Sequence, residues 1–360
     1  MTPAPVRSVA VAVRDDLVDL DGYHSPQVSV DVRLNTNESP YPPPPAWREA
    51  FLEELATVPF HRYPDRQARA LRAAIGELHG VGPDQVLVGK GSNEVLQATC
   101  LAYGGHGRRA AVYEPTYALH SHIARITGTE VVVGERTADF ALDLDEVARV
   151  SKAAEPAITF LTSPNNPTGM VDPQEAVEAV VDLAPGLVVV DEAYAQFAPW
   201  SAMALVADGR PLVVTRTFSK TWSMAACRLG YLVGPAEIVQ QLERVVLPYH
   251  LDAASQIAGR VALRFKAEME ARVSAVVTER ERMVAVLSRL PVRVWPSGAN
   301  FVLFRPNEVD GPAVWKGLVE RSVLVRDCSS WPRLTGCLRV TIGTPDEDDA
   351  FLSALEEVLT

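Results

Sequence analysis

The sequence predicts an α/β protein with a mostly parallel, seven-stranded sheet covered by helices. Short apolar runs rich in β-branched residues alternate with amphipathic stretches over residues 48–250, and this alternation is typical of a parallel sheet with helices on both faces. Polar residues able to bind a ligand follow several of these runs, as they do in open parallel sheets. The runs expected as strands are 86–92, 110–117, 130–135, 157–164, 187–194, 212–220 and 230–235.

The same patterns divide the chain. Residues 48–250 are expected to form a large domain around the sheet. Residues 1–47 are rich in proline and end in NESPYPPPPAW, which favours an extended N-terminal arm. A long helical pattern over 252–290 is followed by further strand and helix patterns. Residues 1–47 and 251–360 are therefore expected to form the arm and a smaller α+β domain.

Composition and charge exclude several classes of protein. The 360 residues are 48% hydrophobic and 22% charged, and the formal net charge is −11. An acidic chain without a basic block is a poor candidate for binding nucleic acid or anionic membranes. No apolar stretch approaches the roughly 18 residues of a membrane span, and the four cysteines show no metal-ligand spacing. We expect a cytoplasmic protein in a reducing compartment, without a metal site.

One group of residues near the predicted strand ends suits a phosphate. A glycine–serine turn opens a helix at Ser92, and helix N-termini bind anions through free N–H groups and the helix dipole. Thr217 and Ser219 add hydroxyl groups, and Arg228 adds a fixed positive charge. These four residues predict a phosphate site.

A second group suits a substituted pyridine ring. Asp191 ends an apolar strand, where a protonated ring nitrogen would balance its charge, and Asn166 and Tyr194 can hold a phenolic oxygen. Tyr117 can stack on an aromatic face, and Lys220 is an amine that can form a Schiff base with a carbonyl group. Each residue alone has a commoner explanation as a turn or surface residue. Together with the phosphate site, they predict pyridoxal 5′-phosphate (PLP) as the cofactor.

Longer motifs carry a family resemblance. SPNNPTG, VVVDEAY and TFSKTWSMAACRLG resemble motifs of the PLP-dependent aminotransferases of fold type I. Other segments resemble histidinol-phosphate aminotransferases, and the resemblance runs from about Arg14 to the C-terminus. These segments are RLNTNESPYPPP (33–44), HRYPD (61–65), YEPTYALH (113–120), LPYHLDAASQ (247–256) and CLRVTIGTPDED (337–348).

The resemblance implies roles for particular residues. Lys220 would carry the cofactor, Asp191 would pair with its ring nitrogen, and Asn166 and Tyr194 would contact its phenolic oxygen. Tyr117 would lie on the ring. The phosphate would be held by Ser92, Asn93, Thr217, Ser219 and Arg228, although Asn93 stands where the family usually has aspartate. Trp222 and Met224 also depart from the family pattern, which usually has smaller or aliphatic residues there.

Other implied roles concern the substrate and a partner subunit. Tyr63 would reach the cofactor phosphate of the neighbouring subunit, which implies a homodimer. The residues expected to bind the substrate, including its own phosphate, are Tyr23, Asn166, Arg326 and Arg339. Lys220, Asp191 and Tyr194 are the expected catalytic residues.

The implied reaction is transamination of L-histidinol phosphate with 2-oxoglutarate, giving imidazole-acetol phosphate and L-glutamate in histidine biosynthesis. Two alternatives use the same scaffold. VRDCSSWP (325–332) is also similar to threonine-phosphate decarboxylases, which are lyases, and an aromatic amino-acid aminotransferase would share the cofactor motifs. A third alternative, the effector domain of a transcription regulator, would need a DNA-binding module, and the 47 residues before the large domain are too short and proline-rich to form one.

Overall fold

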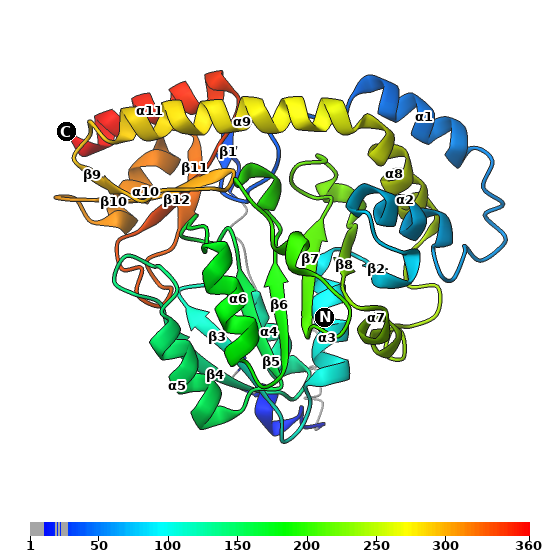
Figure 1. Cartoon of the computed structure of the whole chain (residues 1–360). Coiled ribbons are helices and arrows are strands. Elements are labelled where there is room, and N and C mark those ends of the chain that lie inside the picture. The colour runs from blue at the N-terminus through cyan, green and yellow to red at the C-terminus, as the bar shows by residue number, and fades with distance from the viewer. Residues whose placement is uncertain (1–10, 19, 21, 23–27) are drawn as a thin grey trace, which may run out of the picture.

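Two β-sheets organise the part of the chain that the structure describes (Figure 1). The computed structural model describes residues 11–18, 20, 22 and 28–360. The larger sheet lies in the lower half of the view in Figure 1, and the smaller sheet lies at its upper left. The long helix α9 (Lys266–Leu287) runs along the top of the view, from near α8 (Ala253–Ala262) to the smaller sheet.

The larger sheet has seven strands in the order β2-β8-β7-β6-β5-β3-β4. All neighbouring pairs are parallel except the two made by β8, which is antiparallel to β2 and β7. The predicted mostly parallel seven-stranded sheet is therefore confirmed. The strands are β2 Val86–Gly89, β3 Arg109–Glu114, β4 Glu130–Glu135, β5 Ile158–Thr162, β6 Leu187–Asp191, β7 Leu212–Thr217 and β8 Gly230–Val233.

Several of these strands end earlier than predicted. The predicted ranges included the polar turn residues after the apolar runs, for example Tyr194 after β6 and Lys220 after β7. Both residues lie beyond the sheet, where Tyr194 binds Asn37 and Lys220 binds the backbone of Thr36. The strand ends therefore coincide with the start of the expected site.

Helices cover both faces of this sheet. Alternate residues of β6 point to opposite faces, as in any strand: Val189 packs in a cluster with α3, α4 and α7, and Val188 packs in one with α5 and α6. These buried aliphatic side chains form the core that supports the strand ends. The helices of this part are α2 Arg69–His79, α3 Ser92–Tyr103, α4 Ala118–Ile126, α5 Leu144–Ala154, α6 Gln174–Leu183 and α7 Ala236–Leu242.

The smaller sheet has five strands in the order β1-β11-β12-β10-β9. The N-terminal segment supplies β1 (Val32–Leu34), which pairs in parallel with β11 (Val323–Asp327) at the edge of the sheet. An edge position suits a segment next to many prolines, which cannot donate to a central ladder. The remaining strands, β9 Val292–Val294, β10 Phe301–Pro306 and β12 Leu338–Thr341, are antiparallel to their neighbours.

The predicted continuous helical pattern over 252–290 is interrupted. Helix α8 (Ala253–Ala262) and helix α9 (Lys266–Leu287) are separated by a short 3₁₀ helix at Leu263–Phe265. Val276, Met283 and Leu287 of α9 pack in the core of the smaller sheet. The chain also forms α1 Pro45–Leu55, α10 Gly311–Glu320 and α11 Pro345–Leu359, and further short 3₁₀ helices at Asp15–Leu17, Pro83–Gln85, Ala195–Phe197, Ala202–Leu205 and Ala225–Cys227.

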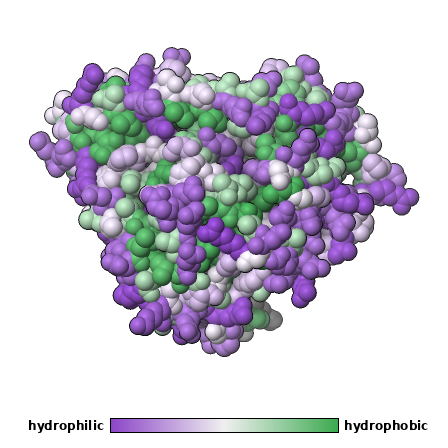
Figure 2. Space-filling view, in the orientation of Figure 1, coloured by the Kyte–Doolittle hydropathy of each residue, from purple (hydrophilic) through white to green (hydrophobic). Residues whose placement is uncertain are grey.

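The surface mixes polar and apolar residues. On the face shown in Figure 2, hydrophilic residues dominate the outer edge of the molecule, and hydrophobic patches lie mostly nearer the middle. In the described ranges, no helix is both long and apolar enough to cross a membrane.

Candidate active site

A cavity of about 450 Å³ lies where the carboxyl ends of the central strands face the smaller sheet. Small-molecule sites commonly have volumes of this size. Side chains expected at the site and found in the cavity wall are Ser92, Asn93, Tyr117, Asn166, Asp191, Tyr194, Thr217, Ser219, Lys220, Arg228, Arg326 and Arg339. The structure therefore brings together nearly all residues that the sequence suggested for one site, although their roles remain predictions.

Two expected residues are not part of this cavity. Tyr63 does not line it; its side chain is 80% exposed and stacks on Tyr249, with ring centroids 4.5 Å apart. This position is compatible with its expected role, which concerns the cofactor of another subunit. Tyr23 lies outside the residues that the structure describes.

Lys220 follows β7 and is held at the cavity wall. Its Nζ donates a hydrogen bond to the backbone oxygen of Thr36, at 2.9 Å. Burial and the nearby positive charge of Arg339 lower the pKa of Lys220 to about 7, because both disfavour the ammonium form. A substantial fraction of Lys220 is therefore a neutral amine near pH 7, and only a neutral amine can act as a nucleophile or base.

Asp191 is the last residue of β6 and is almost completely buried. Its Oδ2 atom lies 3.0 Å from His120 Nε2, and its Oδ1 atom accepts a hydrogen bond from the backbone N–H of Ala193. Because a carboxylate only accepts hydrogen bonds, the His120 proton lies on Nε2. His120 is fully buried and stacks on Phe160, with ring centroids 4.7 Å apart. The carboxylate is thus fixed in position at the wall of the cavity.

Asn166 and Tyr194 are each bound by residues from the other side of the cavity. Asn166 Oδ1 accepts a hydrogen bond from Arg339 Nη1, and Tyr194 Oη accepts one from Asn37 Nδ2 at 3.0 Å. Both residues are about 5% exposed. The expected contacts to a phenolic oxygen therefore come from side chains whose orientation is already set.

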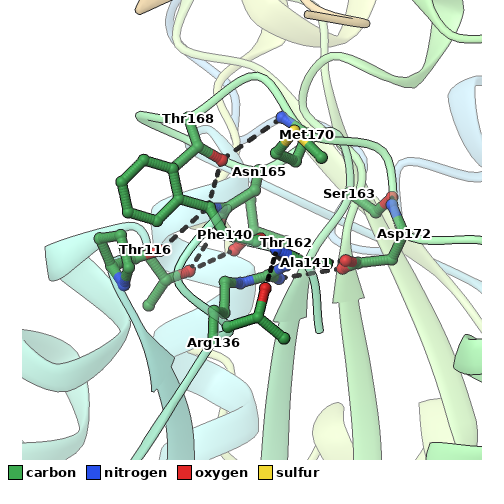
Figure 3. A network of polar contacts seen from close by, with 12 residues as sticks. Thr116, Arg136, Phe140, Ala141, Thr162, Ser163, Asn165, Thr168, Met170 and Asp172 are labelled. Carbon is green, nitrogen blue, oxygen red and sulfur yellow. Dashed lines mark hydrogen bonds and ion pairs between the residues drawn. The ribbon is translucent and has the colours of Figure 1, made fainter. Parts of the chain in front are cut away.

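A buried polar network fixes the loop that carries Asn166 (Figure 3). Asn165 is its centre: Oδ1 accepts from Thr116 Oγ1 at 3.0 Å, and Nδ2 donates to Thr168 Oγ1 and to the backbone oxygen of Pro115. These bonds tie the loop after β5 to the loop after β3, which carries Tyr117. The two loops therefore hold their site residues in a fixed relative position.

A buried ion pair closes the same network (Figure 3). Arg136 binds Asp172 through two parallel hydrogen bonds of 2.7 and 2.9 Å, and both side chains are 1% exposed. The backbone N–H of Asp172 donates to Ser163 Oγ at 3.0 Å. Because an arginine–carboxylate pair with two parallel hydrogen bonds has a strict geometry, it fixes Asp172 at the end of the loop that follows β5.

The expected phosphate site is a tight cradle at the N-terminus of α3. Gly91 precedes this helix with φ +78°, and a Cβ atom built there would lie 2.8 Å from Arg228 Nη2. The positive φ favours glycine at this turn, and any larger residue would displace the guanidinium of Arg228. Arg228 Nη1 also lies 3.4 Å from Ser219 Oγ, and Thr217 Oγ1 accepts from the backbone N–H of Ser219. The cradle therefore combines a helix N-terminus, hydroxyl groups and a cation.

Arg326 and Arg339 form a second positive region on the opposite wall. They are directly opposite each other in the β11–β12 pair, and they are 8% and 5% exposed. Arg339 Nη2 donates to the backbone oxygen of Asn35 at 2.9 Å. Like charges directly opposite on neighbouring strands are unfavourable. An anion bound between the two guanidinium groups would remove that cost.

Two parts of the site were not predicted from the sequence. The segment Asn35 to Glu38 lines the cavity, and its residues bind Arg339, Lys220 and Tyr194. It lies in the motif RLNTNESPYPPP, which carried the family resemblance but received no role. His120 was also missed, although it follows Tyr117 by three residues and therefore lies on the same side of α4.

Comparisons with known proteins identify the family. Residues 29–355 match the model of the family described as aminotransferase class I and II. The chain therefore belongs to this family of aminotransferases, whose members depend on PLP, and the predicted class of enzyme and cofactor are confirmed.

Curated relatives in this family are named histidinol-phosphate aminotransferase. The one from Frankia casuarinae is 45% identical over 97% of this chain and 90% of its own length, and the one from Thermobifida fusca is 44% identical over 95% and 94%. A crystal structure of histidinol-phosphate aminotransferase from Sinorhizobium meliloti in complex with pyridoxal-5′-phosphate superposes with a TM-score of 0.84 at 22% identity, covering 92% of this chain and 91% of that one. The resemblance to histidinol-phosphate aminotransferases is confirmed, as is the fold.

The residues of the cavity fit PLP. The cradle at Gly91 and Arg228 suits its phosphate, the buried Asp191 carboxylate suits its ring nitrogen, and the Lys220 amine suits its aldehyde. The described residues contain no group of three or more His, Cys, Asp or Glu side chains arranged to hold a metal ion.

Proposed function

We propose that the enzyme transfers the amino group of L-histidinol phosphate to 2-oxoglutarate, giving imidazole-acetol phosphate and L-glutamate in histidine biosynthesis. The observation that carries this proposal is a single cavity lined by two separate groups of residues suited to anions, Ser92 with Arg228 and Arg326 with Arg339. The first suits the cofactor phosphate, and the second suits the phosphate or carboxylate of a substrate. Relatives at 44–45% identity support the choice of substrate.

We assign the cofactor contacts to residues of the larger sheet. Lys220 would carry PLP covalently, Asp191 would face its ring nitrogen, and Tyr117 would lie against its ring. Tyr194 and Asn166 would bind its phenolic oxygen. The phosphate would lie against Ser92, Asn93, Thr217, Ser219 and Arg228.

Lys220 and Asp191 are assigned different catalytic roles. When bound, PLP supplies the electron sink that makes the α-proton of an amine substrate acidic. Once the substrate amine had displaced it from the cofactor, the free Lys220 amine, whose pKa is lowered to about 7, would take this proton and deliver it to the cofactor. Asp191 keeps a negative charge beside the ring nitrogen, and His120 holds that carboxylate in place at 3.0 Å.

Arg326 and Arg339 would select the substrates. Both glutamate and histidinol phosphate carry an anionic group distant from the reacting amine, and a pair of guanidinium groups can bind either by two parallel hydrogen bonds. Arg339 also binds Asn166, so it would connect the substrate anion to the cofactor side of the cavity. Tyr23 is assigned to the same substrate phosphate by resemblance alone.

We further propose a cytoplasmic homodimer whose chains divide into a large domain (48–250) and an arm with a small domain (1–47 and 251–360). Tyr63, Phe60, Leu247 and Tyr249 are large and well exposed, as expected for residues that a second copy would cover. Tyr63 would then reach the partner's cofactor phosphate. The four free cysteines suit a reducing compartment.

Mixed dimers test the role of Tyr63. Lys220→Ala and Tyr63→Ala chains should each have low activity alone, and co-expression should restore part of it. Restoration is expected because one site of the mixed dimer has both an intact Lys220 and an intact partner tyrosine. No restoration in a verified mixed dimer would contradict the assignment.

An assay of three amino donors with 2-oxoglutarate tests the reaction. Histidinol phosphate, phenylalanine and threonine phosphate should be compared at equal concentration, with glutamate formation as the measurement. We expect the highest kcat/KM for histidinol phosphate, which has no α-carboxylate. Release of carbon dioxide from threonine phosphate would instead indicate the lyase, and a preference for phenylalanine would indicate an aromatic aminotransferase.

A further inference from the structure

Asn37 connects the smaller sheet to Tyr194 in the larger part of the molecule. Its Nδ2 atom lies 3.0 Å from Tyr194 Oη, and its backbone N–H donates to Thr341 Oγ1, also at 3.0 Å. Its backbone oxygen accepts from Asn300 Nδ2 at 3.2 Å. Asn37 is 1% exposed and has φ +54°, a left-handed conformation that asparagine tolerates better than most residues.

The hydroxyl group of Thr341 determines which way the Asn37 amide faces. Because Thr341 Oγ1 already accepts from the backbone N–H of Asn37, its own hydrogen is available for donation. It donates to Asn37 Oδ1 at 3.1 Å. With its oxygen bound to Thr341, the amide presents its NH₂ group to Tyr194.

This orientation determines what Tyr194 can do. An amide nitrogen only donates, so Tyr194 Oη must accept from Asn37 and direct its own hydrogen to another acceptor. Tyr194 lines the cavity, where we have assigned it to the phenolic oxygen of the cofactor. A hydroxyl group that accepts one hydrogen bond is a stronger donor in the next, because the bonds polarise each other.

We propose that Asn37 is a positioning residue that holds the Tyr194 phenol as a hydrogen-bond donor toward the cofactor, and that Thr341 sets the orientation of the Asn37 amide. This inference rests on the proposed role of Tyr194. It goes beyond that role, because the strength of Tyr194 as a hydrogen-bond donor is set by two distant side chains. Tyr194 follows β6, whereas Asn37 follows β1 and Thr341 lies in β12.

The test uses the visible absorption of the cofactor-loaded enzyme, titrated with pH in the absence of substrate. Weaker donation to the phenolic oxygen leaves this oxygen more basic, so the bound chromophore loses its proton at higher pH. Tyr194→Phe should raise the midpoint, and Asn37→Asp should raise it by at least roughly 0.5 to 1 unit, because one hydrogen bond of ordinary strength is lost and a negative charge is added. An aspartate would accept from the Tyr194 hydroxyl group and turn its hydrogen away from the cavity.

Thr341 and Ser39 provide matched variants. Thr341→Val removes the hydroxyl group at nearly constant shape and should raise the midpoint, and Thr341→Ser retains the hydroxyl group and should not. Ser39→Ala serves as a control for general disturbance of the segment, because Ser39 binds Ser223 Oγ and the backbone of Tyr41 instead. Thermal unfolding of each cofactor-free variant establishes that it is folded, and Thr341→Val provides the test if Asn37→Asp does not fold.

The double variant Thr341→Val/Tyr194→Phe decides whether the effect passes through Tyr194, because it adds no charge that would itself shift the midpoint. We expect its midpoint to equal that of Tyr194→Phe alone. An unshifted midpoint in Thr341→Val, or a shift by Thr341→Val that persists without the Tyr194 hydroxyl group, would overturn the proposal. The titration needs no substrate, so it is independent of the outcome with histidinol phosphate, which tests the reaction itself.

Discussion

The two walls of the cavity are built in different ways. The cofactor wall, named for its proposed role, consists of residues at the ends of β2, β3, β5, β6 and β7 or within four residues after them, together with Arg228 just before β8. The substrate wall consists of Asn35 to Glu38, Arg326 and Arg339, which meet only because β1 pairs with β11 and β11 pairs with β12. Local motifs therefore determine one wall, and the pairing of distant strands determines the other.

Substitutions in the two walls should have different effects. The cofactor wall is proposed to hold the group that carries out the chemistry, so its variants should lose turnover with every substrate. The substrate wall is proposed to bind the part of the substrate that does not react, so its variants should change the choice and affinity of substrates. The following predictions test this difference.

Lys220→Ala should have the largest effect. Without the amine, the cofactor has no covalent attachment and the α-proton has no base, so turnover should fall by about a thousandfold or more. The visible absorption of the attached cofactor should disappear, and the circular dichroism spectrum should stay unchanged. Turnover within tenfold of the wild type would refute the role of Lys220.

Asp191→Asn should have the next largest effect. Asparagine keeps the shape and can still accept from His120, but it removes the charge beside the ring nitrogen. Turnover should fall on the order of 100-fold to 1000-fold for all substrates, as for other preorganised electrostatic contacts. Asp191→Glu retains the charge and serves as the comparison. Equal turnover in Asp191→Asn and the wild type would show that the carboxylate does not act on the ring.

Arg339→Ala should mainly affect substrate binding. Losing a charge-assisted contact should raise KM for histidinol phosphate and glutamate by roughly 10-fold to 100-fold. Cofactor affinity, measured by fluorescence titration, should stay close to that of the wild type. Arg339→Lys keeps the charge without the two-pronged geometry and should be intermediate. Unchanged substrate preference in Arg339→Ala would remove this residue from the substrate wall.

Asp348→Asn tests a buried carboxyl group outside the cavity, in helix α11, which packs against the smaller sheet. Burial raises the pKa of Asp348 from 3.8 to about 8, with a contribution from nearby Glu279. Between these two values the folded protein retains a proton that the unfolded chain releases, so the free energy of unfolding falls as pH rises from about 4 to about 8. The uncharged asparagine lacks this dependence.

Thermal unfolding at two pH values measures this small effect. The Tm of Asp348→Asn, relative to the wild type, should increase between pH 5 and pH 9 by about 2 °C or more. The neighbouring Asp349 is 64% exposed and pairs with Arg282, so Asp349→Asn is a suitable control and should not show this increase. A Tm difference independent of pH would mean that Asp348 is ionised in the folded protein.

Most of the cofactor wall could be predicted from the sequence. The turns SPNNPTG, DEAY and TFSK directly follow apolar runs, and the carboxyl ends of parallel strands meet at one edge of a sheet. The departures at Trp222 and Met224 also have a simple explanation, since both are at most 3% exposed and pack in the core around Phe218. The core around Phe218 therefore has room for the larger side chains of Trp222 and Met224.

The sequence by itself determined the class of fold, the cofactor and the residues that follow each strand, because these depend on periodicity and on short local motifs. Only the tertiary structure decided that His120 supports Asp191, that Thr36 binds Lys220, and that Asn37 faces Tyr194. The physical reason is that such contacts join segments up to 184 positions apart. Their existence depends on strand pairing and side-chain orientation, which no local pattern of residues encodes.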